Sequence, residues 1–513
     1  MTLLLGLDFG TGGVRAGLYD LRSHKLIQVA EAAYATQYPE LGWAEQLPGG
    51  WWSALGDACR RLMAQAGHPA VAGVCVATTA STVVAAKANG EPLRPALLWM
   101  DCRAGQESAR TAEVSHPMMN PGGDAVEWLV PKAMWMARHE PAIYASAERI
   151  CEAVDWINFK LTGRWVASRL NASCKWNYDT RRERFPVELY EQLGVAELAD
   201  KLPREVIAVG GRIGLLTGEA ASHLGLTRDT LVAQGGIDAH MAMLSAGTTG
   251  AGELLFIGGT SVVQLMHTPE RVDVPGIWGP YPDALLDGQW LMEGGQVSAG
   301  SILNWLAQKM FGLDAAGHQQ LIKQAQALKP GSTGLLVLDY WMGNRTPYRS
   351  PDMRGAIMGL SLNHDRHDLY SASVEAIALG SANIFHTWRS QGTEITRVVA
   401  AGGFQNNPLW LQATVDATGV PFEMVAHDNL TLIGTAAAAA CALGAFDTLQ
   451  QAATDFTTQG SIIEPDAQAH DCYVELLERY REATQSVAPI SCKSGLSRAA
   501  RLSPVPLASP AYE

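Results

Sequence analysis

Two glycine-rich turns, each between apolar runs with the composition of strands, are the first stretches whose residue types predict chemistry. Asp8 to Arg15 reads Asp-Phe-Gly-Thr-Gly-Gly-Val-Arg, and Gly258 to Ser261 reads Gly-Gly-Thr-Ser. Glycines let backbone N–H groups converge on one point without an obstructing Cβ, which suits phosphate oxygens. A plain hairpin turn explains either stretch alone. Two such turns favour a polyphosphate held from both sides, with Asp8 as a candidate Mg²⁺ ligand through water.

Three further charged residues stand where chemistry is expected. Asp238 follows the apolar run 231–237, and a carboxylate at the carboxyl end of such a strand points into a cleft. A helix N-cap is the alternative for Asp238. Lys175 and Glu293 lie in apolar surroundings, where an isolated charge needs a partner or a ligand. Surface placement is the alternative for both, and His240 is interpreted as a packed or surface histidine without a catalytic role.

A third glycine pair, Gly402 and Gly403, lies between a predicted strand and a predicted helix. Glycines there permit close approach of a flat ring or a phosphate. The alternative is a simple turn in which Asn407 caps the helix. No GxxxxGK[ST] motif of a P-loop occurs anywhere in the chain.

The elements that must position these residues alternate along the chain. Apolar runs predict hairpins over 3–19 and 253–267, and the two repeats lie too far apart for a solenoid. Alternating strands and helices predict an α/β protein with partly parallel sheets. Further strands are expected at 71–78, 231–237, 335–338, 398–401 and 422–425, and helices near 52–63, 127–138, 369–388 and 409–417.

Domain boundaries follow from the same pattern. The glycine- and threonine-rich stretch 245–252 separates the two hairpin-led halves. We therefore expect an N-terminal lobe over 1–248 and a C-terminal lobe over 249–485. Residues 486–513 are rich in Ser, Pro and Ala without helical period, which predicts a poorly packed tail.

Composition restricts the class of protein. The 513 residues are 47% hydrophobic and 17% charged, so most of the chain is globular rather than disordered. The formal net charge of −13 argues against a dedicated nucleic-acid binder, which needs a basic face. It leaves room for a small phosphate site built from backbone N–H groups.

The compartment is also a prediction from composition. The N-terminal apolar run is short and ends at Asp8, which argues against a signal peptide. The longest uncharged stretch, between Asp428 and Asp447, is mostly Ala, Gly and Thr, so a buried helix is favoured over a membrane span. The eight cysteines form no CxxC pair, and we expect a reduced, cytoplasmic protein without a membrane segment.

With these motifs in place, the chain resembles the FGGY carbohydrate kinases of the actin-like ATPase superfamily, from about residue 3 to about 450. The most specific stretch is Gly355 to Leu360, followed after seven residues by Asp368-Leu369 and then Ala372 to Glu375. The resemblance implies a two-lobed actin-like (ribonuclease H-like) fold with an active site between the lobes. It also implies a helix near 468–485 at the end of the family's fold.

Within that family, the predicted sugar site resembles ribulokinases. Ala77 to Ser81, Trp99 to Arg103 and Cys174 to Trp176 carry this likeness, together with Glu293 to Gln296 and Gly343 to Pro347. The stretch Leu129 to Pro141 instead resembles xylulokinases, so xylulose stays open as the substrate.

The resemblance implies roles for individual residues. Asp238 matches the catalytic base, and Asp8 the aspartate associated with Mg²⁺. Ala80, Lys175 and Glu293, with Asp238, match sugar contacts. The residues that match nucleotide contacts or lie in the matching turns are Thr11, Gly12, Arg15, Gly259, Thr260, Gly300, Asn304, Gly402, Gly403 and Asn407.

The implied function is ATP-dependent phosphorylation of the terminal 5-hydroxyl of a ketopentose, most simply ribulose, with ATP and Mg²⁺. Xylulose or another polyol or ketose of the same family is the first alternative. A nucleotide-gated, non-catalytic protein like actin or an Hsp70-type ATPase is an alternative of another class. The expected partners are the sugar and ATP, without nucleic acid or membrane, and a homodimer stays open.

Overall fold

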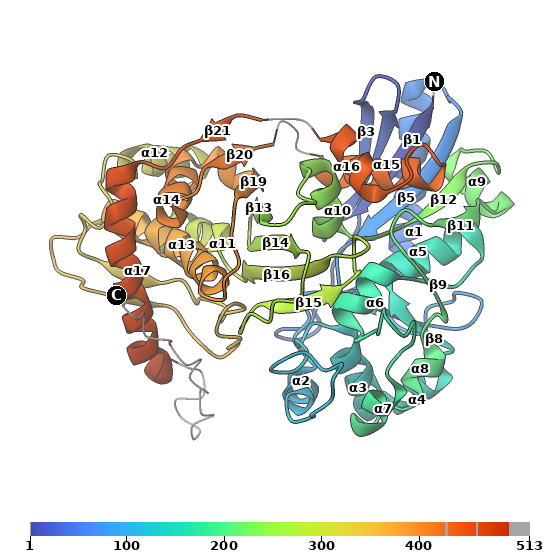
Figure 1. The fold of residues 1–513 in the computed structure, drawn as a ribbon, viewed down its shortest axis with the longest axis horizontal. Helices are drawn as coiled ribbons and strands as arrows, with labels where there is room; N and C mark the ends of the chain where they lie inside the picture. Colours follow the sequence, from blue (N-terminus) through green and yellow to red (C-terminus); the bar gives the residue numbers. More distant parts are fainter. Residues whose placement is uncertain (1, 426–428, 458–459, 492–513) are drawn as a thin grey trace.

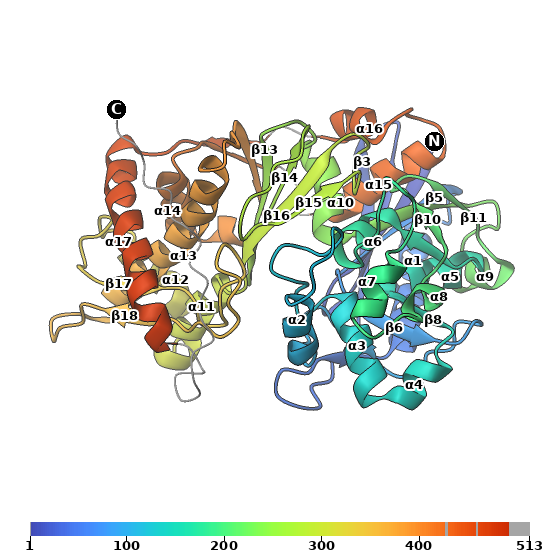
Figure 2. The ribbon, with the colours of Figure 1, turned by 60° about the horizontal axis from the view of Figure 1, so that its bottom comes forward.

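Two mixed β-sheets organise the chain into two lobes, drawn in Figures 1 and 2. The computed structural model describes residues 2–425, 429–457 and 460–491. The first sheet has the strand order β11-β12-β5-β1-β2-β3, and the second has the order β15-β16-β14-β13-β19-β20-β21. The α/β class expected from the alternation of elements is confirmed.

The two sheets repeat one strand scheme. In the first, β1 (Leu3–Phe9) pairs antiparallel with β2 (Gly13–Asp20) and parallel with β5 (Val71–Thr78). In the second, β13 (Glu253–Gly258) pairs antiparallel with β14 (Val262–Thr268) and parallel with β19 (Arg397–Ala401). The two glycine-rich turns, β1–β2 and β13–β14, therefore occupy corresponding positions in the two lobes.

The other strands complete these sheets or form small ones. In the first sheet they are β3 (Lys25–Ala33), β11 (Arg212–Leu215) and β12 (Leu231–Ile237). In the second they are β15 (Trp278–Pro282), β16 (Trp290–Gln296), β20 (Phe422–Met424) and β21 (Ile462–Ile463). The small sheets use β4 (Glu45–Gln46), β6 (Val83–Ala86), β7 (Ala96–Leu97), β8 (Arg149–Glu152), β9 (Val166–Ser168), β10 (Glu205–Ile207), β17 (Leu336–Leu338) and β18 (Ala356–Met358).

Helices cover both faces of each sheet. Those of the first 248 residues are α1 (Pro48–Ala66), α2 (Gly105–Thr111), α3 (Leu129–His139), α4 (Pro141–Ser146), α5 (Ala153–Thr162), α6 (Arg169–Lys175), α7 (Val187–Gln192), α8 (Leu198–Lys201), α9 (Gly218–Leu224) and α10 (Asp238–Ala246). Those that follow are α11 (Gly300–Trp305), η1 (Leu306–Met310), α12 (Ala315–Ala325), α13 (Arg366–Arg389), η2 (Gly403–Asn406), α14 (Pro408–Thr418), α15 (Leu430–Ala442), α16 (Leu449–Phe456) and α17 (Ala467–Ser491).

Helix α15 belongs to the second half of the chain but packs against the first sheet, on β1 and β5, and against α10 (Figure 1). It therefore connects the two halves of the chain. Gly434 makes this packing possible, since a Cβ there would lie 1.9 Å from the carbonyl oxygen of Met241 on α10. The uncharged stretch 429–446 thus contains a buried helix, as its composition predicts. Of the helices within the described residues, none is long and apolar enough to cross a membrane.

The C-terminal helix is longer than the sequence predicts. Tyr473, Tyr480 and Thr484 bury one face of α17, and the helix continues to Ser491 instead of ending near residue 485. Once a helix is anchored, each further residue adds a backbone hydrogen bond at little cost. The start of the predicted tail is therefore helical, and residues 492–513, including Cys492, lie outside the described residues.

Candidate active site

A cavity of about 300 Å³ lies between the two lobes and gathers all four predicted sugar-site residues. Ala80, Lys175 and Asp238 line it from the first lobe, and Glu293 from the second. Thr11 of the first glycine turn and Ser261 of the second also reach its wall. The cavity therefore connects the predicted sugar contacts with the two predicted phosphate loops.

Lys175 and Glu293 form an ion pair across the lobes. Lys175 ends α6, and its Nζ donates to Oε2 of Glu293 on β16 at 2.8 Å. Burial raises the pKa of Glu293, but Lys175 and His240 outweigh burial and hold it below its ordinary value. Both side chains are nearly inaccessible, as the charge-pairing argument predicts for residues in apolar surroundings.

Two tryptophans that sequence reasoning missed enclose this ion pair. The Lys175 ammonium lies 4.7 Å from the ring centre of Trp128 and 5.0 Å from that of Trp278. The rings face it from different lobes and are packed edge to face against each other at 5.3 Å. Because aromatic faces attract cations, the rings fix the ammonium. The only sequence signal was the position of Trp128 at the start of a predicted helix.

Asp238 is the first residue of α10 and directly follows β12, as the strand-end argument predicts. Its Oδ1 accepts a hydrogen bond from the N–H of Ala239 at 2.7 Å. Burial, with repulsion from Asp8, raises the pKa of Asp238 to about 7. The carboxyl group thus lies in the cavity wall with a pKa suited to accepting a proton near neutral pH.

His240, two residues after Asp238 on α10, also lines the cavity. It is buried, as predicted for a packed histidine, but its Nε2 lies 3.7 Å from Oε2 of Glu293. Neither ring nitrogen has a hydrogen-bond partner among the described residues. Burial lowers its pKa to about 4, so the ring is neutral near pH 7 and is a further polar group facing the cavity.

Asp8 and Arg15 are opposite one another in the β1–β2 hairpin. The Arg15 guanidinium donates to Oδ2 of Asp8 at 2.5 Å. Burial raises the pKa of Asp8, and the opposing effect of Arg15 is smaller. Carboxylate oxygens are the hard ligands that Mg²⁺ prefers. Because Asp8 and Asp238 repel each other, a dication near them would be stabilised by both, so these residues fit the predicted metal.

Hydrogen bonds from neighbouring side chains hold the base of the first glycine turn. Trp99 donates to the hydroxyl of Thr11 at 3.0 Å, and Gln46 donates to the Thr11 carbonyl at 2.7 Å. Gly12 is exposed, and a Cβ placed there would meet nothing within 4 Å. The tip is thus open for a ligand while its base is fixed.

The second turn is joined to the other predicted nucleotide residues. The carbonyl of Gly259 accepts from the N–H of Gly300 at 3.0 Å, at the start of α11. Gly402 has φ +101°, and a Cβ there would lie 2.3 Å from the carbonyl oxygen of Gly258. The β13–β14 turn, the start of α11 and the β19–α14 link therefore form one cluster, with Thr260, Asn304 and Gly403 exposed on it.

Asn407 has a structural task in this cluster. Its side-chain oxygen accepts from the N–H of Trp410 at 3.2 Å, and its amide donates to the hydroxyl of Tyr370 at 3.0 Å. The helix-cap alternative raised from the sequence is therefore realised. A nucleotide contact by the same side chain stays a prediction.

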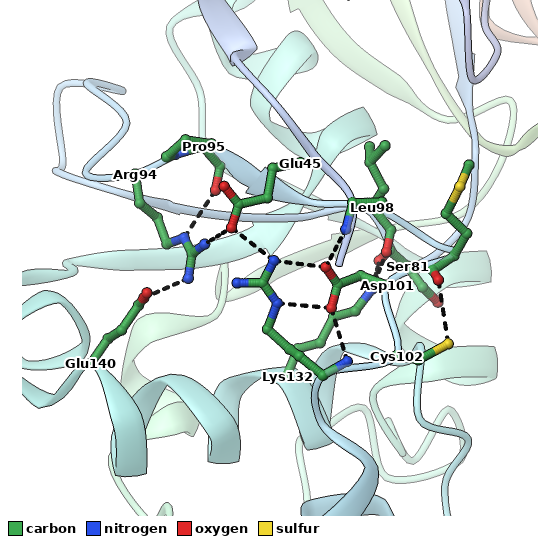
Figure 3. Close-up of polar contacts among 12 residues, drawn as sticks. Glu45, Ser81, Arg94, Pro95, Leu98, Asp101, Cys102, Lys132 and Glu140 are labelled. Carbon is green, nitrogen blue, oxygen red and sulfur yellow. Dashed lines mark hydrogen bonds and ion pairs between the residues drawn. The ribbon is translucent and has the colours of Figure 1, made fainter. Parts of the chain in front are cut away.

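The loop that carries Ala80 is fixed by two buried charges. Lys132 donates to the carbonyls of Ser81 and Leu98 at 2.8 and 2.6 Å (Figure 3), and Glu152 accepts from the N–H of Ser81 at 2.7 Å. Ser81 has φ +56°, a conformation that costs a non-glycine residue energy. Lys132 and Glu152 hold this conformation, and neither was predicted to do so.

Comparison with known proteins decides the family. Models of the FGGY family of carbohydrate kinases match residues 3–245 (N-terminal domain) and 254–443 (C-terminal domain). The chain belongs to the FGGY family of carbohydrate kinases. The resemblance predicted from the motifs is confirmed, and this FGGY kinase is a phosphotransferase that uses a nucleotide and an alcohol acceptor.

Several relatives of this FGGY kinase are named as kinases of a pentulose. A ribulokinase of Geobacillus thermodenitrificans is 31% identical over 492 residues, or 86% of each chain. The human FGGY carbohydrate kinase domain-containing protein is 28% identical over 93% of this chain and 96% of its own. The crystal structure of xylulose kinase from Rhodospirillum rubrum matches with a TM-score of 0.83 at 27% identity, over 95% of this chain and 99% of that one. The predicted two-lobed actin-like fold is confirmed.

Proposed function

We propose that this FGGY kinase transfers the γ-phosphoryl group of ATP to the terminal 5-hydroxyl of a ketopentose, with ribulose as the preferred sugar. The observation that carries the proposal is the single cavity shared by Asp238, the Lys175–Glu293 pair and the two glycine turns. A base, polar groups for sugar hydroxyls and phosphate-binding loops are the parts that such a transfer needs.

Asp238 is the proposed general base. As the hydroxyl oxygen forms its bond to the γ-phosphorus, the bond from that phosphorus to the β,γ-bridging oxygen breaks and ADP leaves. The hydroxyl proton goes to the carboxylate of Asp238, whose pKa of about 7 leaves a large ionised fraction near neutral pH. A positioned base of this kind contributes ~10²–10⁴-fold to the rate.

A guanidinium and backbone N–H groups of this chain are the proposed partners of the negatively charged phosphates. Arg15 is half-exposed beside Asp8, and the tips of both glycine turns present backbone N–H groups. Asp8 is the proposed ligand for Mg²⁺. The ion, when bound, neutralises charge on the phosphate oxygens.

The choice of sugar is assigned to Lys175 and Glu293. Buried polar groups that bind substrate hydroxyls reject an epimer that leaves them unpaired. The names of the ribulokinase relatives support ribulose. Xylulose is the second candidate, because solved xylulose kinases share the fold over nearly the whole chain at 27% identity.

A coupled assay of ADP formation across D- and L-ribulose and D- and L-xylulose tests the proposal. Sugar-dependent ADP formation with ribulose as the best substrate is expected. ADP formation that no sugar increases would instead favour the nucleotide-gated alternative. A higher kcat/KM for xylulose would keep the kinase class and replace the sugar.

A further inference from the structure

A second cavity, of about 370 Å³, lies between the lobes and shares no lining residue with the first. Residues 116–121, Ser173 and part of the stretch 177–188 line it from the first lobe, and Arg271, Tyr281 and Trp290 are among those that line it from the second. It is larger than the proposed sugar cavity, and the proposed mechanism does not use it. Its volume falls within the ~300–1,000 Å³ of ligand pockets.

Three deeply buried polar atoms of this cavity lack partners among the described residues. They are Oγ of Ser173, Oδ1 of Asn177 and the hydroxyl of Tyr281. The three residues are 7%, 4% and 4% exposed. A buried polar group left unpaired costs about 1–3 kcal/mol. Three of them around one cavity, from both lobes, point to a ligand that forms hydrogen bonds.

The orientation of Asn177 defines the kind of bond. Its amide Nδ2 donates to the carbonyl of Met118 and to Oδ1 of Asp124, both at 3.1 Å. The amide oxygen is therefore the atom of this lining residue left without a partner among the described residues, and it can only accept. A ligand that meets it must supply a donor, such as a hydroxyl group. Ser173 and Tyr281 can donate to or accept from further hydroxyls.

The rim of the cavity carries an excess of positive charge. Three of its arginines pair with carboxylates: Arg182 with Asp179, Arg184 with Glu188, and Arg271 with Asp273, at 3.7, 3.3 and 2.8 Å. Arg181 has no ion pair among the described residues and lies over the ring of Trp290, 4.8 Å from its centre. Because Trp290 comes from the other lobe, this cation stands where the two lobes meet.

We propose that this second cavity binds a small phosphorylated polyol, with its phosphate at Arg181 and its hydroxyls at Ser173, Asn177 and Tyr281. A phosphate suits an unpaired guanidinium, and the carbon chain of a sugar phosphate supplies the donors that Asn177 requires. Since the ligand touches both lobes, its binding is coupled to their relative position and hence to binding in the first cavity.

Calorimetric titration of the full-length protein tests the proposal, with D-ribulose 5-phosphate and inorganic phosphate as probes. Arg181→Gln and Tyr281→Phe are expected to weaken D-ribulose 5-phosphate binding at least about tenfold. Arg212→Gln, which removes an exposed arginine of β11, is the matched control and should bind as the unaltered protein does. Inorganic phosphate should bind at least about tenfold more weakly, because it reaches only the arginine.

Two control experiments separate a lost ligand contact from a folding defect and from binding in the first cavity. Tyr281→Phe removes an unpaired hydroxyl, so its melting temperature should be unchanged or higher, and a loss of affinity then reports a lost ligand contact. Repeating the titrations in a Glu293→Gln background removes a sugar contact of the first cavity; the Arg181-dependent binding should survive there. No binding at millimolar probe, equal binding by Arg181→Gln, or inorganic phosphate binding as tightly as the sugar phosphate would each overturn the proposal.

Discussion

Lys175 of the first lobe and Glu293 of the second are joined by a 2.8 Å hydrogen bond inside a pocket of two tryptophan rings. Each charge is stable in this buried place because the other lobe supplies its partner. The pair therefore exists only when the lobes approach, and the same approach brings Asp238 and the glycine turns to one cavity. If Lys175 and Glu293 bind the sugar as proposed, sugar recognition and assembly of the site are coupled.

Lys175→Met should raise the KM for the sugar at least about tenfold and leave the KM for ATP nearly unchanged, since a hydrogen bond to a charged group contributes about 1.5–3 kcal/mol. It should also lower stability by about 3 kcal/mol, because Glu293 stays buried without its partner. Steady-state kinetics and urea unfolding measure the two effects. The double variant Lys175→Met with Glu293→Gln removes the leftover charge, so it should regain stability without regaining sugar affinity. Equal rises in both KM values would contradict the assignment of Lys175 as a sugar contact.

Asp238→Asn should lower kcat by ~10²–10⁴-fold while ATP binding is retained, because the amide cannot accept the proton. The unaltered enzyme should lose activity as pH falls through about 7, where Asp238 becomes protonated. That acidic limb should be absent from the residual activity of Asp238→Asn. Profiles of kcat/KM against pH check this, and near-normal turnover by the variant would disprove the base assignment.

The same carboxyl group should make the fold less stable at high pH. Its pKa is about 7 in the folded chain against an ordinary 3.8, so the folded state binds more protons than the unfolded state between these values. Stability should fall as pH rises from about 4 to above 7. Asp238→Asn, which cannot ionise, should therefore melt at a higher temperature than the unaltered protein at pH 8. The gain should shrink toward pH 4, and thermal melts of both proteins across this range measure it.

Local sequence signals predicted the parts of the site that depend on local structure. Strand β12 followed by Asp238, and the two hairpin turns, could be found because alternation and turn chemistry act over a few residues. Trp278 could not be paired with Lys175, because they are about a hundred residues apart in the chain and meet only across the lobes. The packing of α15 on the first sheet is equally non-local.

Sequence also left open which of two roles a polar residue takes. Asn407 fitted a helix cap and a nucleotide contact, and only the fold shows that its oxygen caps α14. Lys132 lay in a stretch that resembled the family, but its bonds to Ser81 and Leu98 depend on two loops distant in sequence.

Lys132→Met should reduce kcat/KM for the sugar more than the affinity for ATP, because it frees the loop that carries Ala80. It leaves the carbonyls of Ser81 and Leu98 without this donor, at a cost of about 1–3 kcal/mol for each. Urea unfolding and sugar saturation curves at a temperature where the variant is folded check both effects. Lys323→Met, on an exposed face of α12, is the matched control and should change neither. If the variant has normal sugar kinetics and lowered stability, Lys132 contributes to folding stability and does not position the sugar site.

Gly12→Ala and Gly403→Ala separate a ligand role of glycine from a packing role. A Cβ at either position meets nothing within 4 Å, so both variants should keep the melting temperature of the unaltered protein within about one degree. If backbone N–H groups at these tips contact phosphate or adenosine, the added methyl should weaken ATP binding by about tenfold. Gly402→Ala is the contrasting case: its Cβ would lie 2.3 Å from the Gly258 carbonyl oxygen at φ +101°, and it should destabilise the fold by more than about 2 kcal/mol. Thermal melts of all three variants with and without ATP measure these effects. Unchanged ATP affinity in both tip variants would contradict a nucleotide contact at these turns.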